Sequence, residues 1–286
     1  MVPKAILICA STNGCIIAMK YRYLNIGCGA TWHKDWKNID LNSYSPNVLS
    51  YNITKGIPYP DNYFDAVYHS HLLEHLSQSE GEMFILECAR VLKKGGILRV
   101  AVPDLETIAK EYLVQLNLAL KGDARAQKNY KWITLELYDQ ATRTVSGGDM
   151  EPYLRQEHLT TKSYIRKRLG LVANQYFKKN NTSVTKRGEY PQDNPHKIFR
   201  ALVKLLFKQS FVQSFDEAFF RNTGELHKMM YDKYSLRTML THNGFINVKP
   251  VTAFTSEIIN FNRYDLDTLR GKVRKADSLF MEARKF

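Results

Sequence analysis

A glycine turn and a carboxylate lie close together near the start of the chain. Leu24-Asn25-Ile26, the end of a largely apolar strand, leads into Gly27-Cys28-Gly29, and the next short strand ends on Asp40. Glycines let the backbone adopt unusual dihedrals and let a ligand approach closely. A carboxylate at the end of the neighbouring strand can accept hydrogen bonds from ribose hydroxyls. This pattern predicts a nucleoside-binding crevice at the carboxyl edge of a parallel sheet.

Two common nucleotide motifs are absent from the sequence. The glycine turn is followed by Ala30-Thr31-Trp32, so the third glycine of a dinucleotide fingerprint is missing. The chain also has no phosphate-binding G-x-x-x-x-G-K-[ST] loop. The alternative to a nucleoside site is an ordinary strand and turn followed by a surface aspartate.

Later stretches show the strand and helix order of a doubly wound sheet. Residues 61–70 predict an apolar strand, after which Leu73-Glu74-His75 begins a helix. Residues 90–104 predict a helix end, a Gly-Gly turn and a further strand. Residues 240–248 predict a helix, a glycine C-cap and a strand, and residues 278–284 predict the closing strand.

In order and spacing, these segments resemble the class I S-adenosylmethionine (SAM) methyltransferase family over about residues 20–105 and 224–286. The resemblance implies an α/β fold, a Rossmann-like seven-stranded sheet with helices on both faces and a largely helical insert after strand five. It also implies SAM as the cofactor and methyl transfer as the activity. Residues 147–150 and 224–232 look like elements of relatives associated with bacterial polysaccharide and small-metabolite pathways.

The resemblance also implies where SAM binds. The glycine turn would hold the methionine part, Asp40 the ribose, and His69 would lie beside the sulfonium. The full set of implied cofactor-binding residues is Asn25, Gly27, Cys28, Gly29, Asp40, Leu41, Asn52, Ile53, His69 and His71.

Two features depart from the family pattern. Few residues separate Gly29 from the second strand, so we expect the usual first helix to be short or absent. Asn52 stands where many relatives carry an aspartate near the adenine amine. An asparagine carbonyl can accept the same hydrogen bond.

The predicted organisation has a core, an insert and an extension. Residues 19–105 and 224–286 form the SAM-binding core. Residues 106–223 are too many for a loop and form a basic insert, which in this family serves as a lid or acceptor pocket. Residues 1–18 are expected to be a dispensable or non-native extension before Met19. A truncated chain that fails to fold or bind SAM would contradict this.

Helical spacing and polar composition subdivide the insert. Apolar positions recur at helical spacing over residues 105–120, 124–142, 153–177 and 198–215, whereas residues 178–195 predict a polar loop.

Composition limits the class of protein. The 286 residues are 44% hydrophobic, enough for one core with an elaboration. Four cysteines without metal or disulfide spacing indicate a reduced, cytoplasmic protein, and no apolar run reaches transmembrane length. The net charge is +13, and residues 151–212 contribute +9 of it through 13 basic and 4 acidic residues. This excess predicts either a solvated surface or contact with an anionic acceptor or membrane.

Residues 197–208 form a basic amphipathic pattern, with lysine and arginine on one face and apolar residues on the other. Such a helix most often packs its apolar face on the core. The alternative is peripheral association with an anionic membrane surface, which binding to anionic liposomes at low salt would test.

A competing pattern suggests a metal. His71-Leu72-Leu73-Glu74-His75 matches H-x-x-E-H, in which two histidines on one helical face ligate zinc and the glutamate acts as a base. The motif directly follows a buried strand of a SAM-type sheet, and the same helix start is common among methyltransferases. We therefore expect no metal and no zinc hydrolysis.

Methyl transfer needs alignment, exclusion of water and, for a hydroxyl acceptor, a base. Position at the strand ends favours His69 and Asp104 as catalytic groups, although Asp104 could instead cap the next helix. The other candidate bases are His71, His158, His227 and Asp232.

The favoured acceptor is a hydroxylated small molecule or glycan, anionic or lipid-linked. RNA is the alternative on charge, but the basic stretch lacks an aromatic stacking platform and an RNA-binding module. A third alternative is a catalytically silent SAM-fold scaffold or partner subunit. Retention of Gly27, Gly29 and Asp40 argues against it.

Overall fold

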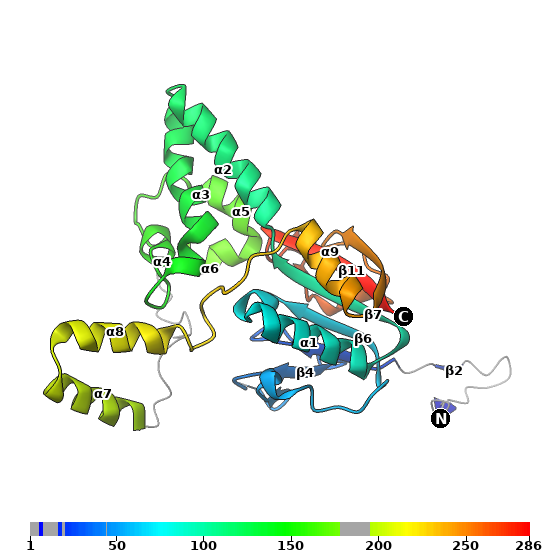
Figure 1. Cartoon of the computed structure of the whole chain (residues 1–286). Helices are drawn as coiled ribbons and strands as arrows, with labels where there is room; N and C mark the ends of the chain where they lie inside the picture. The colour runs from blue at the N-terminus through cyan, green and yellow to red at the C-terminus, as the bar shows by residue number, and fades with distance from the viewer. Residues whose placement is uncertain (1–5, 8–16, 19–20, 44, 178–194) are drawn as a thin grey trace.

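The computed structural model describes residues 6–7, 17–18, 21–43, 45–177 and 195–286 (Figure 1). Its main feature is a seven-stranded sheet of order β5-β4-β3-β6-β7-β11-β8. Strand β11 is antiparallel to β7 and β8, and the other neighbours are parallel. This topology confirms the predicted Rossmann-like fold. The strands are β3 (Tyr23–Ile26), β4 (Lys37–Asp40), β5 (Val48–Ser50), β6 (Phe64–Ser70), β7 (Leu92–Pro103), β8 (Phe245–Val251) and β11 (Ser278–Lys285).

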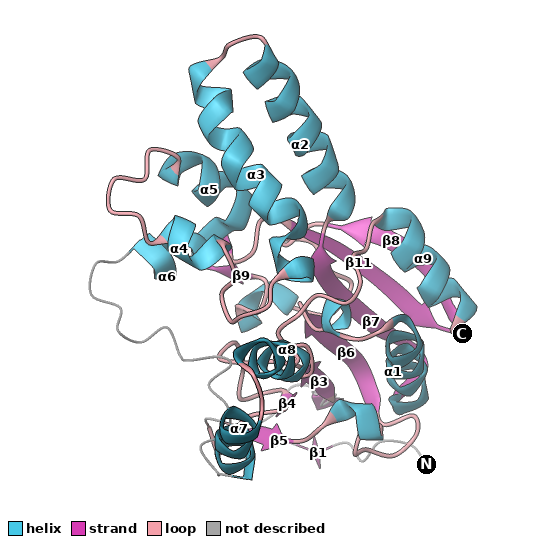
Figure 2. Cartoon of the chain, turned by 60° about the vertical axis from the view of Figure 1, so that its left-hand side comes forward, coloured by secondary structure: helices cyan, strands magenta, loops and turns pink. Residues whose placement is uncertain are grey.

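Helices α1 (Gln78–Val91) and α9 (Lys233–His242) cover one face of the sheet, as Figure 2 shows. A capping box starts α1, because the Ser77 hydroxyl accepts from the Glu80 amide and the Glu80 carboxylate accepts from the Ser77 amide. Phe84, Ile85 and other apolar residues of α1 pack on Leu24 and Val67 of the sheet in one core cluster. Alternating strand residues therefore point to this face.

The opposite face lacks a long helix among the described residues. No helix lies between Gly27 and Trp36, which confirms that the usual first helix is missing. Tyr23 and Tyr68 on this face pack instead against the 3₁₀ helix η4 (Phe261–Tyr264) and its neighbours. We call residues 252–267 the cover segment. It replaces the missing helix as the apolar cover of β3 and β6.

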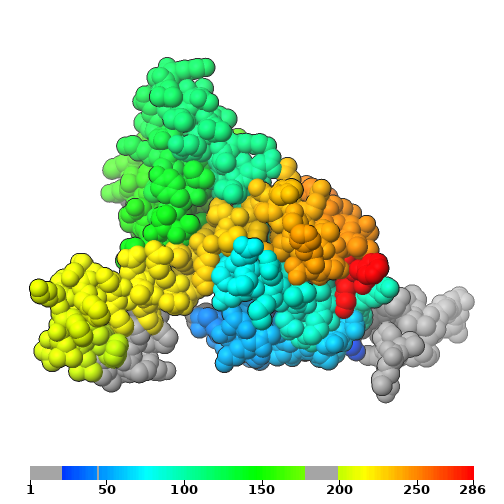
Figure 3. Space-filling view, in the orientation of Figure 1, coloured from blue at the N-terminus to red at the C-terminus, as the bar shows by residue number. Residues whose placement is uncertain are grey.

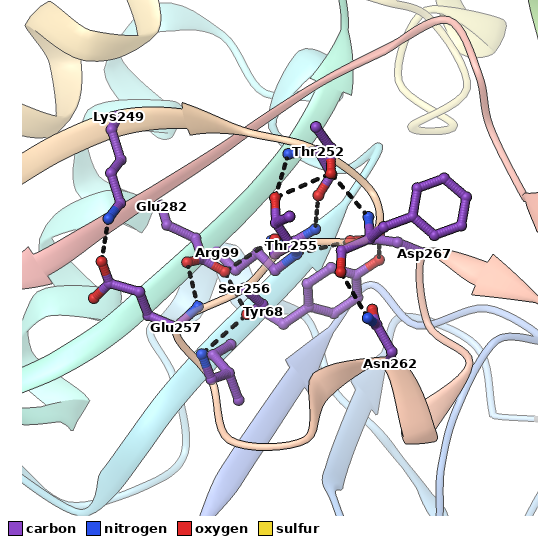
Figure 4. A network of polar contacts seen from close by, with 12 residues as sticks. Tyr68, Arg99, Lys249, Thr252, Thr255, Ser256, Glu257, Asn262, Asp267 and Glu282 are labelled. Atoms are coloured by element: carbon purple, nitrogen blue, oxygen red, sulfur yellow. Dashed lines mark hydrogen bonds and ion pairs between the residues drawn. The ribbon is translucent and has the colours of Figure 1, made fainter. Parts of the chain in front are cut away.

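A buried arginine fixes the cover segment to the sheet (Figure 4). Arg99 on β7 is fully buried, and its guanidinium donates to Asp267 (2.7 Å) and Glu282 (2.7 Å). It also donates to the backbone carbonyls of Thr252 and Thr255, each at 2.9 Å. Two carboxylates and two carbonyls thus satisfy the buried charge, as such a site requires.

The insert begins at the carboxyl edge of the sheet, since its first helix α2 (Leu105–Leu120) directly follows β7. Its green part lies above the rest of the molecule in Figure 3. Helices α2 and α3 (Ala124–Thr142) have the predicted bounds. The two other predicted helices are each divided. The pieces are α4 (Met150–Leu154), α5 (Lys162–Leu169), η3 (Gly170–Val172) and α6 (Ala173–Phe177), then α7 (Pro195–Leu206) and α8 (Gln209–Phe220).

The predicted Gly95-Gly96 turn lies inside β7, next to a shift in register with β6. Two short pairs, β1 (Ile6–Leu7) with β2 (Ile17–Ala18) and β9 (Thr268–Leu269) with β10 (Lys272–Val273), lie outside the main sheet. The predicted polar loop lies almost wholly in residues 178–194, outside the described residues.

Candidate cofactor and acceptor site

The predicted glycine turn lies at the carboxyl end of β3. Gly27 and Gly29 have positive φ angles of 65° and 51°, which explains why glycine is needed at both positions. The amides of Gly27 and Cys28 donate to the Ile39 carbonyl, at 2.8 and 3.2 Å. A Cβ added at Gly27 would lie 3.0 Å from Leu72, so the turn also packs closely against the segment after β6.

Asp40 connects the turn to the end of β4. One carboxylate oxygen accepts a hydrogen bond from the Gly29 amide at 2.7 Å, and the other accepts from the Asn42 amide at 3.1 Å. Each oxygen has a second lone pair for a further donor. The carboxylate is thereby held in place with capacity to bind ribose hydroxyls.

Two buried asparagines fix the loop that replaces the first helix. Asn25 donates to the Thr31 carbonyl (3.1 Å) and to the Asn38 side chain (3.2 Å). Asn38 in turn donates to the carbonyls of His33, Trp36 and Asn47. Asn25 is 1% exposed, so its position supports the loop beneath the glycine turn. The sequence pattern gave no signal for Asn38.

The predicted adenine side is more exposed. Asn52 is the N-cap of η1 (Ile53–Lys55), and its carbonyl accepts from the Thr54 amide (3.0 Å) and hydroxyl (2.8 Å). Both lone pairs of that oxygen are therefore used, which leaves the amide NH₂ for a ligand. Leu41 is 55% exposed beside Asp40, where an apolar side chain can pack against a base.

The two predicted catalytic groups have different surroundings from those expected. His69 is fully buried and packs against Phe84 of α1, with ring centroids 5.0 Å apart. Burial lowers the pKa of His69 to about 3, which makes it a weak base. Asp104 is the N-cap of α2 and accepts from the Thr107 amide and hydroxyl. Catalysis by either group stays a prediction that this geometry does not favour.

Four other polar residues gather at the carboxyl end of β6, and we call them the His–Glu cluster: His71, Glu74, His75 and His227. His71 has a positive φ of 52° and Glu74 lies in the 3₁₀ helix η2 (Leu73–His75). The interpretation of H-x-x-E-H as one helical face is therefore wrong. The loop and the 3₁₀ turn nevertheless place a His71 nitrogen 3.4 Å and a His75 nitrogen 3.9 Å from the same Glu74 oxygen.

His227 reaches this cluster on a segment that returns from the insert to the core. The amides of Lys228 and Met229 donate to the Glu74 carbonyl, at 2.7 and 3.1 Å. The His227 ring lies edge-on to the His75 ring, with centroids 4.8 Å apart. Sequence spacing could not reveal this contact, because about 150 residues separate His227 from His75.

The two sequence elements noted for their family likeness contact each other here. Glu225 accepts from the Gly147 amide at 2.8 Å and pairs with Arg143 at 3.0 Å. Arg143 also pairs with Asp139 of α3 at 2.6 Å. These contacts fix the segment that carries His227 onto the insert.

Burial keeps three members of the His–Glu cluster, His71, Glu74 and His227, largely uncharged. It raises the pKa of Glu74 to about 8 and lowers the pKa of His71 and of His227 well below the usual histidine range. The nearby Lys275 charge further lowers the pKa of both histidines. Near neutral pH, the rings of His71 and His227 are therefore neutral, and each keeps one nitrogen with a lone pair.

The remaining candidate bases lie elsewhere. His158 is exposed on the insert, and Asp232 caps α9 through Ser235, whose hydrogen bond lowers the pKa of Asp232.

A cavity of about 730 Å³ lies at the amino ends of β3 and β4, where Tyr21, Arg22 and Lys34 line it. That edge is opposite the glycine turn, so the cavity is separate from the predicted cofactor site.

Comparisons with known proteins find one matching family model and several solved structures. Residues 31–100 match a family described as a methyltransferase domain. No curated protein sequence matches the chain. One similar solved structure is the [4+2]-cyclase SpnF, with 29% identity over 29% of this chain and 38% of that chain and a TM-score of 0.24. A SAM-dependent methyltransferase from Archaeoglobus fulgidus has 12% identity over 93% of this chain and 86% of that chain, with a TM-score of 0.37. A SAM-dependent methyltransferase from Thermotoga maritima has 11% identity over 93% of this chain and 83% of that chain, also with a TM-score of 0.37. Because these TM-scores are low, the fold assignment rests on the strand order of this chain.

Strand order, the glycine turn and the aspartate of β4 define a nucleoside-binding α/β protein. Together with the match of residues 31–100 to a methyltransferase domain, they make the chain similar to class I SAM-dependent methyltransferases, and SAM is the cofactor that this likeness implies. Among the described residues, no helix is long and apolar enough to cross a membrane.

Proposed function

We propose that the protein transfers the methyl group of SAM to a hydroxyl group of a small molecule or glycan. The observation that carries this proposal is the shared carboxyl edge of the sheet. The glycine turn and Asp40 follow β3 and β4, and the His–Glu cluster follows β6 beneath the segment from the insert. A cofactor held at the first position would present its methyl group toward the second.

The residues of the chain would perform separate tasks. When bound, SAM supplies an activated methyl group on a positively charged sulfur. Gly27, Gly29 and Asp40 hold and orient the nucleoside, and the insert excludes water from the strand ends. His71 is placed to take the acceptor proton, since burial leaves its ring neutral while 14% of its side chain stays accessible. His69 is too enclosed for this task.

The charges of the insert favour a small anionic acceptor over RNA. Three arginines of the basic stretch are already paired: Arg155 with Glu151, Arg168 with Glu136 and Arg200 with Asp216. Arg168 is also buried. These arginines are not presented as a continuous phosphate-binding surface of the kind that long RNA requires.

The described end of the basic amphipathic helix supports an additional proposal, that the acceptor is presented at an anionic membrane. Leu205 and Leu206 of α7 are 80% and 70% exposed, and Phe207 after it is 49% exposed. Leu205 and Leu206 do not pack on the core, although Phe207 stacks on Phe211 of α8 and Val203 is buried. An exposed apolar face beside lysines fits an anionic lipid surface.

Calorimetric titration with SAM and with S-adenosylhomocysteine tests the proposal first. The Asp40→Ala variant should bind SAM roughly 10- to 100-fold more weakly, because charge-assisted hydrogen bonds contribute about 1.5–3 kcal/mol. Asp35→Ala is the matched control. Asp35 is an exposed carboxylate just before β4 that pairs with Arg263, and its loss should leave SAM affinity unchanged.

Binding that is equal in the wild type and the Asp40→Ala variant would contradict the cofactor assignment. Where SAM binds as expected, transfer of labelled methyl to sugar nucleotides, lipid-linked glycans and RNA compares the acceptor classes. Salt-sensitive labelling of RNA alone would reverse our choice of acceptor.

A further inference from the structure

We propose that Glu74, His75 and His227 form a binding site for a divalent transition-metal ion, with zinc as the best match. One ligand atom from each residue lies within 4.8 Å of the others. Two imidazole nitrogens and one carboxylate oxygen are the donor set of many catalytic zinc sites. No protease function follows from this, because the residues lie at the strand ends of a methyltransferase sheet.

The hydrogen bonds of His75 prepare it to act as a ligand. Its Nδ1 lies 3.2 Å from the Leu226 carbonyl oxygen, which can only accept. Nδ1 must therefore carry the hydrogen, and in the neutral ring Nε2 presents its lone pair. That Nε2 is the nitrogen that lies 3.9 Å from Glu74. A backbone carbonyl that orients a histidine in this way is a recurrent support of metal ligands.

The other two residues bring buried polar atoms without hydrogen-bond partners. Both Glu74 carboxylate oxygens and Nδ1 of His227 have no hydrogen bond to any described residue. Glu74 is fully buried and His227 is 5% exposed. Buried polar groups normally have partners, and an unmade bond costs about 1–3 kcal/mol each. A shared cation would bind one Glu74 oxygen and one His227 nitrogen and would neutralise the buried carboxylate.

The present spacing is wider than that of a bound ion. Tetrahedral zinc with bonds of about 2.0–2.1 Å holds its ligand atoms roughly 3.3 Å apart. The three side chains would therefore have to close by about an ångström on binding. The positive charge of Lys275, which acts on Glu74 and His227, weakens the site. We accordingly expect a single site of moderate affinity.

Three protein ligands leave a fourth position open on the metal ion. His75 is the most exposed of the three, with 22% of its side chain accessible, so the open position faces the acceptor side. A hydroxyl oxygen of the acceptor could bind there and be held for attack. This role rests on the proposed function, whereas metal binding itself does not.

The test uses the full chain without a His-tag, freed of metal by a chelator. Zinc is titrated in competition with a chromogenic chelator, and cobalt is substituted to read the ligand geometry from its visible spectrum. Wild type should bind one equivalent of zinc. Glu74→Gln and His227→Asn should each bind at least about 100-fold more weakly, since loss of even a supporting neighbour costs 10- to 100-fold. The exposed His242→Asn is the control and should bind like wild type.

Each outcome decides between the proposals. No zinc uptake by wild type, no tetrahedral cobalt spectrum, or equal uptake by the ligand variants would overturn the metal site. If the wild-type protein binds SAM but takes up no zinc, only the metal site is overturned and the proposed function stands. Zinc uptake without SAM binding would contradict the proposed function and leave the metal site intact. The cobalt spectrum is measured on the wild-type protein, so this test does not depend on whether the variants fold.

Discussion

Replacing His69 with leucine should remove a measurable part of the sensitivity of the fold to acid. His69 is fully buried against Phe84, and neither ring nitrogen has a hydrogen-bond partner among the described residues. Burial lowers the pKa of His69 to about 3, because the charged ring would lose its hydration. Leucine has a similar size and no titrating group.

The expected magnitude follows from proton linkage. The folded-state pKa is lowered, so the unfolded chain binds the proton first as the pH falls. Stability is therefore lost from about pH 6.5 downward, until the folded-state pKa near 3 is reached. At pH 5, His69 alone should lower the free energy of unfolding by about 2 kcal/mol relative to pH 8. This value depends almost entirely on the unfolded-state pKa.

Urea unfolding of wild type and His69→Leu at pH 8 and pH 5 measures this effect. The wild type should lose about 2 kcal/mol more than the variant between the two pH values. His242→Asn, which removes an exposed histidine, controls for the loss of one imidazole. An equal loss in wild type and His69→Leu would refute the reasoning. Weak SAM binding by a well-folded His69→Leu would instead support the sequence-based role of His69 beside the cofactor.

Three further predictions use matched variants. Gly27→Ala should lower the free energy of unfolding by about 1–3 kcal/mol more than Gly244→Ala, as measured in urea; both positions have positive φ, but only at Gly27 would the new Cβ meet a leucine at 3.0 Å. Arg99→Met should lower the free energy of unfolding by about 3–5 kcal/mol, because it leaves two buried carboxylates without their cation. Loss of the partly exposed ion pair of Arg284 should lower it by only about 0–1 kcal/mol. Equal losses for the two variants would contradict the network of Figure 4. The wild type should sediment with anionic vesicles at low salt and Leu205→Glu should not, while a wild type that ignores such vesicles would exclude the membrane proposal.

The sequence predicted the sheet well because its signals were local. Apolar runs that ended in glycine or a carboxylate indicated β3 and β4, and Gly244 marked the boundary between α9 and β8. The long helices α2 and α3 followed from helical spacing alone. Spacing could not show where a helix is interrupted. Lys208 begins α8 as its N-cap without a strong sequence signal, so α7 and α8 were predicted as one helix.

The candidate site was predictable on one side only. The glycine turn and Asp40 lie near each other in the sequence, at the ends of two neighbouring parallel strands, but the pattern did not predict their direct contact at 2.7 Å. The acceptor side depends on contacts between distant segments. His227 meets His75 only because Glu225 and the backbone of the returning segment attach it to the insert and to η2. A histidine on a strand likewise gives no signal of which face it points to, so the enclosure of His69 could not be foreseen.

Because the first helix is missing, the loop that follows the glycine turn packs directly on the cover segment. Trp36, at the end of the loop that follows the glycine turn, packs on Tyr264 and Phe261 of the cover segment, with ring centroids 5.4 and 6.1 Å apart. The cover segment has one 3₁₀ turn, and hydrogen bonds with Arg99, Tyr68 and Glu282 hold it on the sheet. Arg99 makes the largest number of these bonds. Loosening that anchor should release Trp36 and, through it, the loop that orients Gly29 toward Asp40. Arg99→Met should therefore weaken SAM binding although Arg99 lies outside the predicted cofactor site, and unchanged SAM affinity in a folded variant would show that the loop is held by Asn25 and Asn38 alone.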